Sequence, residues 1–365
     1  MTNDRSPAPQ PPCTPAPATA LTSSLIIVNY NGRQHLQRCL PSVLQAGPPS
    51  EVIVVDNASS DGSAEYVVTM FPQVRLIRNE ANLGFGHGAN LGAREARGHC
   101  LVFLNPDTVV EPGWLEALVA ALQAHPEAGL VTSRVLLLAD PARINTCGNE
   151  VHVSGLTLCR GLGQERSTLA LPHEVGAVSG AAFAIRREGF QALGGFDESF
   201  FMYMEDTDLS WRARLAGQRC LCIPASNVRH DYALQVGPQK VFYQERNRYL
   251  MWLKALRWRT WLLLLPALLL AEVVTWGFVL LRDRAHWTNK LRTYPWIARH
   301  WRAIMDSRRR TQAQRRVRDR ELLALTSYRL DYGQSGQGRT AQLASQVLDP
   351  LFWLLRRLAL AVMVW

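Results

Sequence analysis

The feature that most constrains this chain is a regular alternation, between residues 24 and 107, of short apolar runs and segments of helical spacing. Each apolar run ends in turn-forming residues, as a fully buried strand does. Strands that alternate with helices at this interval form βαβ units, whose crossovers make the strands parallel and cover both faces of the sheet. The strands are predicted at 25–28, 51–55, 74–77 and 100–104. We therefore expect an α/β protein with a mostly parallel sheet.

The pattern becomes mixed further along the chain. It predicts a strand at Ala177–Ile185, a helix near Thr207–Leu215 and a strand at Cys220–Ile223. The seven cysteines are scattered and form no CxxC pair, which argues against a disulfide framework or a zinc ribbon. Cys220 and Cys222 fall on one side of a strand, where core packing is expected.

Polar side chains follow three of the four predicted strands, at the point where each strand ends. They occur at Asn29 to Asn31, at Asp56-Asn57, and at Asn105 to Asp107. Because ligands of open α/β sheets bind beyond the carboxyl ends of the strands, these side chains are expected to converge on one binding site.

Two of these residues are carboxylates with more than one interpretation. Asp107 stands in a turn set by Pro106, where it can offer hard oxygen ligands to Mg²⁺ or Mn²⁺, or simply cap the turn. Asp56 can accept hydrogen bonds from a nucleobase or ribose, or cap the helix that begins just downstream. The residues alone leave both alternatives open.

A glycine-rich stretch follows the third strand. Gly84, Gly86 and Ala89 match the loose GxGxxA pattern of dinucleotide-binding loops. The long polar entry before it, residues 78–82, differs from the tight turn of that motif. Glycines that permit a close backbone approach are the simpler interpretation.

An acidic cluster follows an aromatic run at 200–204. Glu205, Asp206 and Asp208 place like charges close enough to raise one another's pKa, which suits a general base. An exposed acidic helix start is the alternative, although the aromatic run makes full exposure improbable. His230 could ligate a metal, contact a phosphate, or have a purely structural role.

Together these segments resemble a family 2 glycosyltransferase with the GT-A fold, in the bacterial rhamnosyltransferase-like branch that builds O-antigen, cell-wall or capsular polysaccharide. The resemblance covers about residues 24–235 and continues weakly into 243–256. The matching segments occur in the family order: Ser24–Asn31, Val55–Ser63, Asn82–Gly86 with Asn90, Leu104–Thr108, Ser179–Ala181, Gly194–Glu198, Phe200–Arg212 and His230. The implied fold is α/β, with a Rossmann-like, mostly parallel central sheet flanked by helices, followed by a C-terminal helical membrane-associating region.

The resemblance also implies roles for single residues. Asp206 is similar to the family's catalytic base, and Glu205 to its structural neighbour. Asp107 matches the last acid of the family's metal-binding DxD motif, in which Asn105 replaces the first acid. His230 resembles the histidine that completes the metal or diphosphate site. The implied metal ligands are thus Asp107 and His230.

Two further groups of residues follow from the same resemblance. The nucleotide sugar is expected to contact Asn29, Asn31, Asp56, Asn82, Gly84, Asn90 and Asn105. The acceptor site, or the residues that orient it, is expected at Gly180, Asp208 and Arg212.

The implied activity is inverting transfer of a sugar, with rhamnose as a candidate, from a UDP- or dTDP-linked donor. The acceptor would be a hydroxyl of a glycan or lipid-linked molecule in cell-surface polysaccharide synthesis. Mg²⁺ or Mn²⁺ would be the cofactor, stabilising the departing nucleoside diphosphate.

The composition divides the chain into three parts. Residues 1–22 are rich in proline and lack the apolar core of a signal peptide, so we expect them to be disordered and the catalytic part to be cytoplasmic. Residues 23–239 form the expected GT-A domain. Residues 240–365 hold 23 basic and 8 acidic side chains, a net charge of +15, and form a basic, apolar helical tail.

The tail contains an apolar run, Trp261–Leu281, that is interrupted only by Glu272 and is long enough to cross a bilayer core of about 30 Å. The 15 basic residues of 282–350 oppose a single span, because positive charge favours the cytoplasmic side. We therefore expect peripheral or re-entrant helices on the cytoplasmic face of the cell membrane, with arginines on anionic headgroups. A buried helix packed on the catalytic domain is the alternative.

Two other functions fit parts of the sequence. A Rossmann-type oxidoreductase would use the glycine loop and Asp56 for a nucleotide, but it leaves the acidic cluster at 205–208 unexplained. A nucleic-acid binder would use the arginine-rich tail, yet that tail lies between stretches rich in leucine and tryptophan. We therefore expect no nucleic-acid partner.

Overall fold

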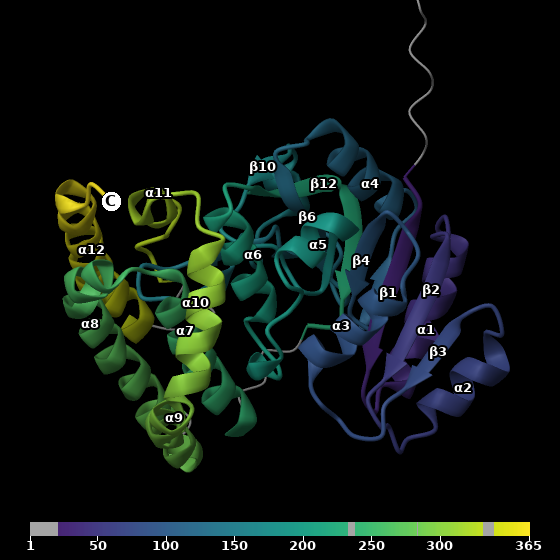
Figure 1. The fold of residues 1–365 in the computed structure, drawn as a ribbon, viewed down its shortest axis with the longest axis horizontal. Coiled ribbons are helices and arrows are strands. Elements are labelled where there is room, and N and C mark those ends of the chain that lie inside the picture. Colours follow the sequence, from purple (N-terminus) through teal and green to yellow (C-terminus); the bar gives the residue numbers. More distant parts are fainter. Residues whose placement is uncertain (1–20, 233–237, 283, 331–338) are drawn as a thin grey trace, which may run out of the picture.

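The computed structural model of the protein describes residues 21–232, 238–282, 284–330 and 339–365. The predicted disorder at 1–22 concerns residues that lie, up to residue 20, outside this range. The described chain forms a three-layer α/β unit followed by a group of helices that lies to one side of it (Figure 1).

The central sheet begins with four parallel strands in the spatial order β3–β2–β1–β4. Each strand contains one of the predicted apolar runs: β1 (Ser23–Asn29), β2 (Glu51–Asp56), β3 (Arg75–Arg78) and β4 (Cys100–Leu104). Every residue of β1 and β4 is buried, as expected for strands covered on both faces. The register pairs Asn29 with Asp56, so the polar residues at the ends of β1 and β2 are neighbours.

The other half of the sheet is mixed. β11 runs antiparallel between β4 and β6, and β12 pairs parallel with β6. Short strands complete this half at β12 and β6. The bounds are β5 (Thr108–Val110), β6 (Ala128–Leu137), β7 (Ile144–Thr146), β10 (His173–Glu174), β11 (Ala182–Arg186) and β12 (Arg219–His230).

Two predicted strands differ from those observed. β11 begins at Ala182 instead of Ala177, because the Ala182 N–H bonds the Ser179 carbonyl at 3.3 Å and closes a turn there. β12 continues past Ile223 to His230, with an irregularity in its pairing on the way. The prediction that Cys220 and Cys222 belong to the core is confirmed, since both are fully buried.

Helices cover both faces of the sheet (Figure 1). One face packs against α1 (Arg33–Gln45), α2 (Ser63–Met70) and α4 (Trp114–Ala124). The other packs against α3 (Phe85–Glu95), α5 (Arg187–Ala192) and α6 (Glu205–Leu215). The sheet is therefore the middle layer.

The remaining short elements lie in the connections between the longer ones. They are the hairpin β8 (Asn149–Val151) and β9 (Thr157–Cys159), and the 3₁₀ turns η1 (Arg166–Leu169), η2 (Glu198–Phe200) and η3 (Arg284–His286).

The tail folds into a helical group whose apolar core is shared with residues of the catalytic part, among them Val151, Trp211 and Leu215. Its helices are α7 (Pro238–Ala255), α8 (Trp258–Arg282), α9 (Trp287–Arg299), α10 (Trp301–Ala313), α11 (Asp319–Ala324) and α12 (Arg339–Val362). α7 and α6 both contribute to this core and contact each other, so contacts cross the predicted domain boundary at residue 240.

Several basic residues of the tail serve the tail's own structure. Arg308 donates to the backbone oxygens of Leu253 and Leu256, and Arg315 pairs with Asp319 at 2.5 Å. These guanidinium groups hold the ends of neighbouring helices. This use of the arginines removes part of the motivation for a nucleic-acid surface.

Candidate active site at the carboxyl edge of the sheet

The loops after β1 and β2 are joined through two buried side chains. Asn29 Nδ2 donates to Asp56 Oδ1 at 2.8 Å, and Asp56 Oδ2 accepts from the Ser59 N–H at 2.9 Å. Both oxygens of Asp56 are thus engaged, and its side chain is almost fully buried. In this structure Asp56 shapes the loop that follows β2.

Asn31 lies at the exposed rim of the same loops. Its backbone N–H donates to Ser59 Oγ at 2.8 Å, and its Oδ1 accepts from the Ser60 N–H at 2.8 Å. Its φ of 51° places it in the left-handed region, which asparagine tolerates better than most residues. Asn31 and Ser60 are therefore the groups of this rim that a ligand can reach.

Gly84 begins α3 at a point of close backbone contact. A Cβ there would lie 2.3 Å from the carbonyl oxygen of Phe201, and φ at Gly84 is 89°. Asn82 Oδ1 accepts from the Gly84 N–H, and Asn57 Nδ2 donates to the Gly84 carbonyl, both at 3.0 Å. The simpler interpretation of this glycine, close backbone approach, accounts for these contacts.

Asn90 is used to hold a neighbouring loop. Its Nδ2 donates to the Phe196 carbonyl at 3.0 Å and to Glu198 at 2.9 Å, and its Oδ1 accepts from the Phe196 N–H at 2.8 Å. With all these bonds made, its contacts favour support of the 196–198 loop over contact with a nucleotide sugar.

Asp107 and His230 meet at the edge of the sheet. β5 and β12 pair His230 with Thr108, and His230 Nε2 lies 3.3 Å from Asp107 Oδ2. Asn145 Oδ1 lies 2.8 Å from His230 Nδ1. Because an amide oxygen only accepts, Nδ1 carries a proton in this arrangement, and the other ring nitrogen, Nε2, faces Asp107.

The same pair has the chemistry of a small cation site. Asp107 Oδ1 is buried and accepts no hydrogen bond from any described residue. Burial on its own would raise the pKa of Asp107, but the hydrogen bond and charge of His230 outweigh it and lower that pKa. An ionised oxygen without a partner beside an imidazole nitrogen fits a divalent cation. The described residues hold no cluster of three or more such ligands, so a substrate would have to supply the rest.

Asp206 stands at the start of α6 and is held by donors on both oxygens. Its Oδ2 accepts from the Gly180 N–H at 2.6 Å and from Asn149 Nδ2 at 3.4 Å. Its Oδ1 accepts from the Thr207 N–H at 2.7 Å. The turn at Ser179 therefore orients the Gly180 N–H toward the carboxylate of Asp206.

Glu205 and Asp206 are neighbours at the start of α6, but their hydrogen-bond partners differ. Burial and then the charge of Asp206 raise the pKa of Glu205, and burial raises the pKa of Asp206 against the pull of the Gly180 and Thr207 donors. Glu205 Oε2 has no hydrogen-bond partner among the described residues. The hydrogen-bond donors contact Asp206, whereas Glu205 Oε2 has none in the described part of the chain. We therefore assign the negative charge of the pair to Asp206 and the shared proton to Glu205.

Asp208 and Arg212 face a different set of partners. Arg212 Nε donates to Asp208 at 2.8 Å, and the buried Lys254 of α7 donates to Asp208 at 2.7 Å and to Asp197 at 2.5 Å. These contacts favour a role in holding α6 over direct contact with an acceptor.

The Asp107–His230 pair and the Glu205–Asp206 pair are linked by one turn. Asn105, at the end of β4, donates its backbone N–H to the Ala181 carbonyl at 3.0 Å. Gly180, the preceding residue, bonds Asp206, while Asp107 lies two positions beyond Asn105. The fold thus brings together acids that lie far apart in the sequence.

Sequence reasoning missed three residues of this site. Asn145 orients His230, Asn149 reaches Asp206, and Ser59 links the β1 and β2 loops. The two asparagines lie in a region of short strands without periodicity, so no sequence signal marks them. Ser59 lies in a segment whose pattern indicates only the start of a helix.

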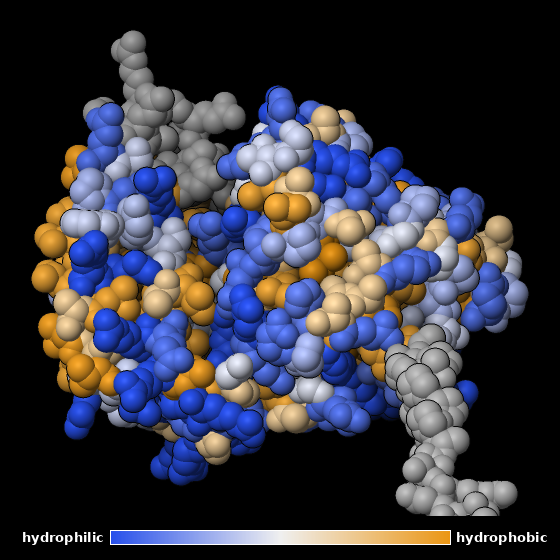
Figure 2. Space-filling model, turned by 90° about the horizontal axis from the view of Figure 1, so that it is seen from above, coloured by the Kyte–Doolittle hydropathy of each residue, from blue (hydrophilic) through white to orange (hydrophobic). Residues whose placement is uncertain are grey.

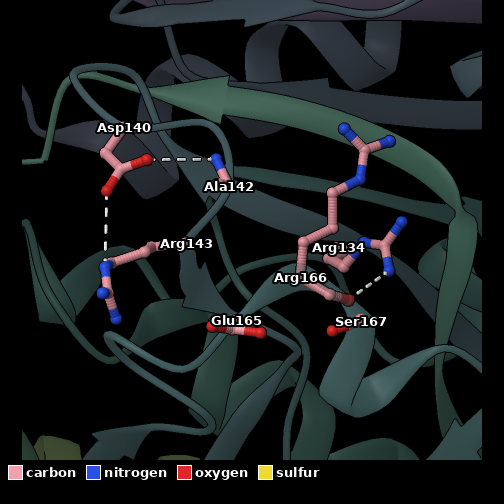
Figure 3. Close-up of a pocket in the computed structure, with 7 residues that line it drawn as sticks. All are labelled: Arg134, Asp140, Ala142, Arg143, Glu165, Arg166 and Ser167. Carbon is pink, nitrogen blue, oxygen red and sulfur yellow. Dashed lines mark hydrogen bonds and ion pairs between the residues drawn. The ribbon is translucent and has the colours of Figure 1, made fainter.

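A second polar cleft, of about 680 Å³, opens beside β6 (Figure 3). Its guanidinium groups already have partners: Arg143 pairs with Asp140 at 3.4 Å, and Arg134 donates to the Arg166 carbonyl at 2.9 Å. Arg166 pairs with Glu111 at 3.2 Å. None of the predicted site residues lines this cleft, whereas Asn90 and Arg212 line a further cleft of about 640 Å³ beside Lys254.

The fold and the site define a class before any comparison. A sheet with a parallel half, polar loops at its carboxyl edge, an Asp–His pair and a buried acid pair at the start of α6 is the architecture of a GT-A glycosyltransferase. Residues 24–194 match the model of Glycosyl transferase family 2.

Known proteins agree with this assignment. The chain is 34% identical over 250 residues to N-acetylglucosaminyl-diphospho-decaprenol L-rhamnosyltransferase of Mycobacterium tuberculosis, covering 58% of this chain and 77% of that protein. The chain therefore belongs to glycosyltransferase family 2 and is a glycosyltransferase.

Solved structures share the fold. The crystal structure of S. aureus TarS 1-349 aligns with a TM-score of 0.53 and 16% identity over 93% of this chain and 88% of that one. GalNAc-T7 with UDP, GalNAc and Mn²⁺ aligns with a TM-score of 0.52 and 23% identity over 64% of this chain and 48% of that one. The predicted GT-A fold is thus confirmed, as is the resemblance to the family.

Proposed function

We propose that this glycosyltransferase moves a sugar, with inversion, from a UDP- or dTDP-linked donor to a hydroxyl of a lipid-linked glycan in cell-surface polysaccharide synthesis. The observation that carries the proposal is the unequal acid pair, in which Asp206 alone holds the charge. One base suffices for direct displacement, whereas glycosidases need two carboxyl groups at the scissile bond.

The donor is placed at the rim formed by Asn31, Ser60 and the start of α3. The exposed polar groups there can hydrogen-bond a nucleoside, and Asn29, Asp56 and Asn82 hold the loops that carry them. Direct contact of Asp56 with the nucleobase stays a prediction, since both of its oxygens are engaged.

Asp107 and His230 would hold a divalent cation, Mg²⁺ or Mn²⁺, together with the donor's diphosphate. When bound, such a cation supplies positive charge to the leaving diphosphate. Asn145 orients the His230 ring so that Nε2 faces Asp107. The Mn²⁺ bound with UDP in the GalNAc-T7 structure supports a divalent cation in this fold.

The chemical step uses the protein's own carboxylate. Asp206 Oδ2 takes the proton of the acceptor hydroxyl while the hydroxyl oxygen attacks the anomeric carbon from the face opposite the nucleotide. The bond to the diphosphate oxygen breaks, and the configuration inverts. We assign this proton to Oδ2, which Gly180 holds at 2.6 Å and Asn149 contacts only weakly at 3.4 Å.

The rhamnosyltransferase named above suggests the substrates. Its name gives a polyprenyl diphosphate carrying N-acetylglucosamine as acceptor and L-rhamnose as the sugar. The test incubates the purified protein with UDP- and dTDP-sugars, this acceptor and Mg²⁺ or Mn²⁺, then measures released nucleoside diphosphate and the anomeric configuration of the product by NMR. Product of retained configuration, or no product with any donor, would contradict the proposal.

A lipid-linked acceptor requires the enzyme to work at a membrane, and the tail offers a surface for this. α8 and α12 contact each other, and both expose apolar side chains on their outer face. Figure 2 shows these apolar groups on the flank where the two helices lie. The exposed residues are Leu262, Leu265, Leu269, Val273, Leu280, Leu281, Leu351, Leu354, Leu358 and Val362.

The opposite side of α8 is held against α7 and α9 by ion pairs. Glu272, the one charge in its apolar run, pairs with Arg248 of α7 at 2.5 Å and with Lys290 of α9 at 3.3 Å. α8 is long and apolar enough to span a bilayer, but spanning would break these pairs. We therefore propose that α8 and α12 lie in the cytoplasmic leaflet, with Arg259 and Trp258 at the headgroups.

Vesicle flotation tests this placement. Wild-type protein is expected to float with vesicles that contain phosphatidylglycerol, and the triple variant Leu262→Ser, Leu265→Ser, Leu269→Ser is expected to remain in solution. Leu171→Ser, a change at an equally exposed leucine of the catalytic domain, serves as the matched control. Equal flotation of the wild type and the triple variant would contradict the leaflet placement.

A further inference from the structure

The six residues before the acid pair, Ser199–Met204, form what we call the aromatic loop, and its backbone is strained. Phe201, Tyr203 and Met204 have φ values of 61°, 65° and 65°. Side chains other than glycine rarely adopt such angles, and they persist only where surrounding contacts enforce them. Strain concentrated just before Glu205 calls for a structural cause.

That cause lies on α7, in the tail. Asn247 Nδ2 donates to the carbonyl oxygens of Phe200, Met202 and Tyr203 at 3.0, 2.9 and 2.7 Å. Arg246 Nη2 donates to the carbonyls of Ser199 and Phe200 at 2.7 and 2.6 Å. Five hydrogen bonds from two adjacent side chains thus reach four carbonyls of one short loop.

The two donors are also fixed relative to each other. Arg246 Nε donates to Asn247 Oδ1 at 2.9 Å, which orients the amide so that its NH₂ group faces the loop. Both side chains are buried, Asn247 completely, so water does not compete for these bonds. On the same helix, Lys254 holds Asp197 and Asp208, which flank the aromatic loop on either side.

The aromatic loop touches both halves of the active site. The Phe201 carbonyl accepts from the Phe85 N–H at 2.7 Å, at the glycine start of α3. At its other end the loop leads directly into Glu205 and Asp206. A shift of this loop would therefore move the base and the donor rim together.

We propose that Arg246 and Asn247 are positioning residues that hold the aromatic loop in its strained form and so keep Asp206 against the Gly180 N–H. The inference rests on the proposed role of Asp206 as base. It assigns a part of the catalytic apparatus to the tail, beyond the predicted boundary at residue 240.

The decisive variant is Asn247→Asp, which keeps the size of the side chain but replaces its two donor hydrogens with a carboxylate that faces three carbonyl oxygens. We expect kcat to fall by about 10²-fold, the loss associated with a misplacement of about 1 Å, while the Kd for nucleoside diphosphate changes little. Asn289→Asp is the matched control, since the side chain of Asn289 contacts Arg292 of its own helix.

A rescue separates positioning from general stability. In the Asn247→Ala background, Tyr203→Gly removes the penalty for positive φ, because glycine adopts these angles freely. We expect the double variant to regain at least part of the lost kcat, relative to Asn247→Ala and to Tyr203→Gly alone. A loss of folded protein that accounts for the whole loss of activity, without rescue, would overturn the proposal.

Hydrogen exchange provides a readout that does not depend on activity. Amides of residues 199–208 are expected to exchange faster in Asn247→Asp than in wild type, while those of β1 and β4 stay unchanged. Unaltered exchange in this segment would overturn the proposal even if the wild-type protein transferred no sugar. Absence of transfer by wild type with altered exchange would instead reject only the proposed function.

Discussion

The sheet edge and the helical tail both bury charged side chains, but they treat them differently. In the tail, Arg248 and Lys290 lie between Glu245 and Glu272, so each charged group has a partner of opposite sign, although Arg248 Nε has no hydrogen-bond partner among the described residues. At the sheet edge, Asp107 Oδ1 and Glu205 Oε2 are buried without a hydrogen-bond partner among the described residues. Burying an unpaired polar atom is costly, and it persists where a ligand completes it.

This difference indicates which buried charges serve chemistry and which serve folding. Paired charges in the tail hold α7, α8 and α9 together at fixed positions. Incompletely paired charges at the edge leave binding capacity for a cation, a diphosphate or a proton. Substitutions should therefore separate the two regions, with activity lost in one and stability lost in the other.

The largest effect is expected from Asp206→Asn. The amide keeps the size of the side chain but cannot take a proton, so kcat should fall by up to about 10⁴-fold, the upper range for a general base. Binding of nucleoside diphosphate, measured by calorimetry, should persist. Asp140→Asn in the second cleft is the control, and near-normal turnover of Asp206→Asn across several pH values would remove Asp206 from the base role.

Lys290→Met should lower the stability of the protein and leave its activity unchanged. Lys290 is fully buried and donates to Glu245 at 2.7 Å, and loss of one partner of a buried ion pair costs about 3–5 kcal/mol. Urea denaturation should show this loss in the free energy of unfolding, while kcat per folded molecule stays unchanged. Arg299→Met, at an exposed position of α9, is the control. A Lys290→Met protein of wild-type stability would contradict the contrast drawn between the regions.

Asn145→Ala tests the orientation of His230. Residues that orient a metal ligand typically contribute about 10–100-fold, so roughly that loss of activity is expected, together with weaker Mn²⁺ binding in the presence of nucleotide. EDTA should abolish the wild-type activity, and added Mn²⁺ or Mg²⁺ should restore it. Full activity in EDTA would show that the Asp107–His230 pair holds no catalytic cation.

Glu205→Gln should have the smallest effect on activity. Glu205 carries the shared proton, so glutamine resembles its neutral form. Its raised pKa means that the native state binds the proton more tightly than the unfolded chain, so its stabilising contribution is present at low pH and is lost as pH rises through that raised pKa. The variant should therefore melt a few degrees above wild type at alkaline pH, since about 1 kcal/mol shifts Tm by roughly 2–4 °C. Identical melting of both proteins at pH 5 and pH 9 would refute this assignment of the proton.

Local pattern was enough to predict the parallel half of the sheet and its binding edge. The four apolar runs and the turn residues after them became β1 to β4, and Asn29, Asp56 and Asp107 came together at one edge. This was possible because strand periodicity and turn chemistry are set by neighbours in the sequence. The acidic start of α6 was visible for the same reason.

Only the tertiary structure decided how those residues are used. Asn145 lies 85 positions from the histidine it orients, and Asn247 lies 44 positions from the Tyr203 carbonyl it holds, separations at which no local pattern can indicate a partner. By length and composition, α8 could cross a bilayer. The ion pairs of Glu272 with Arg248 and Lys290, however, hold one face of this helix against the rest of the protein. The sequence by itself determined the sheet, its polar edge and the acidic pair. Tertiary packing determined which charges are satisfied, because a buried polar group takes its partner from whatever element folding brings against it.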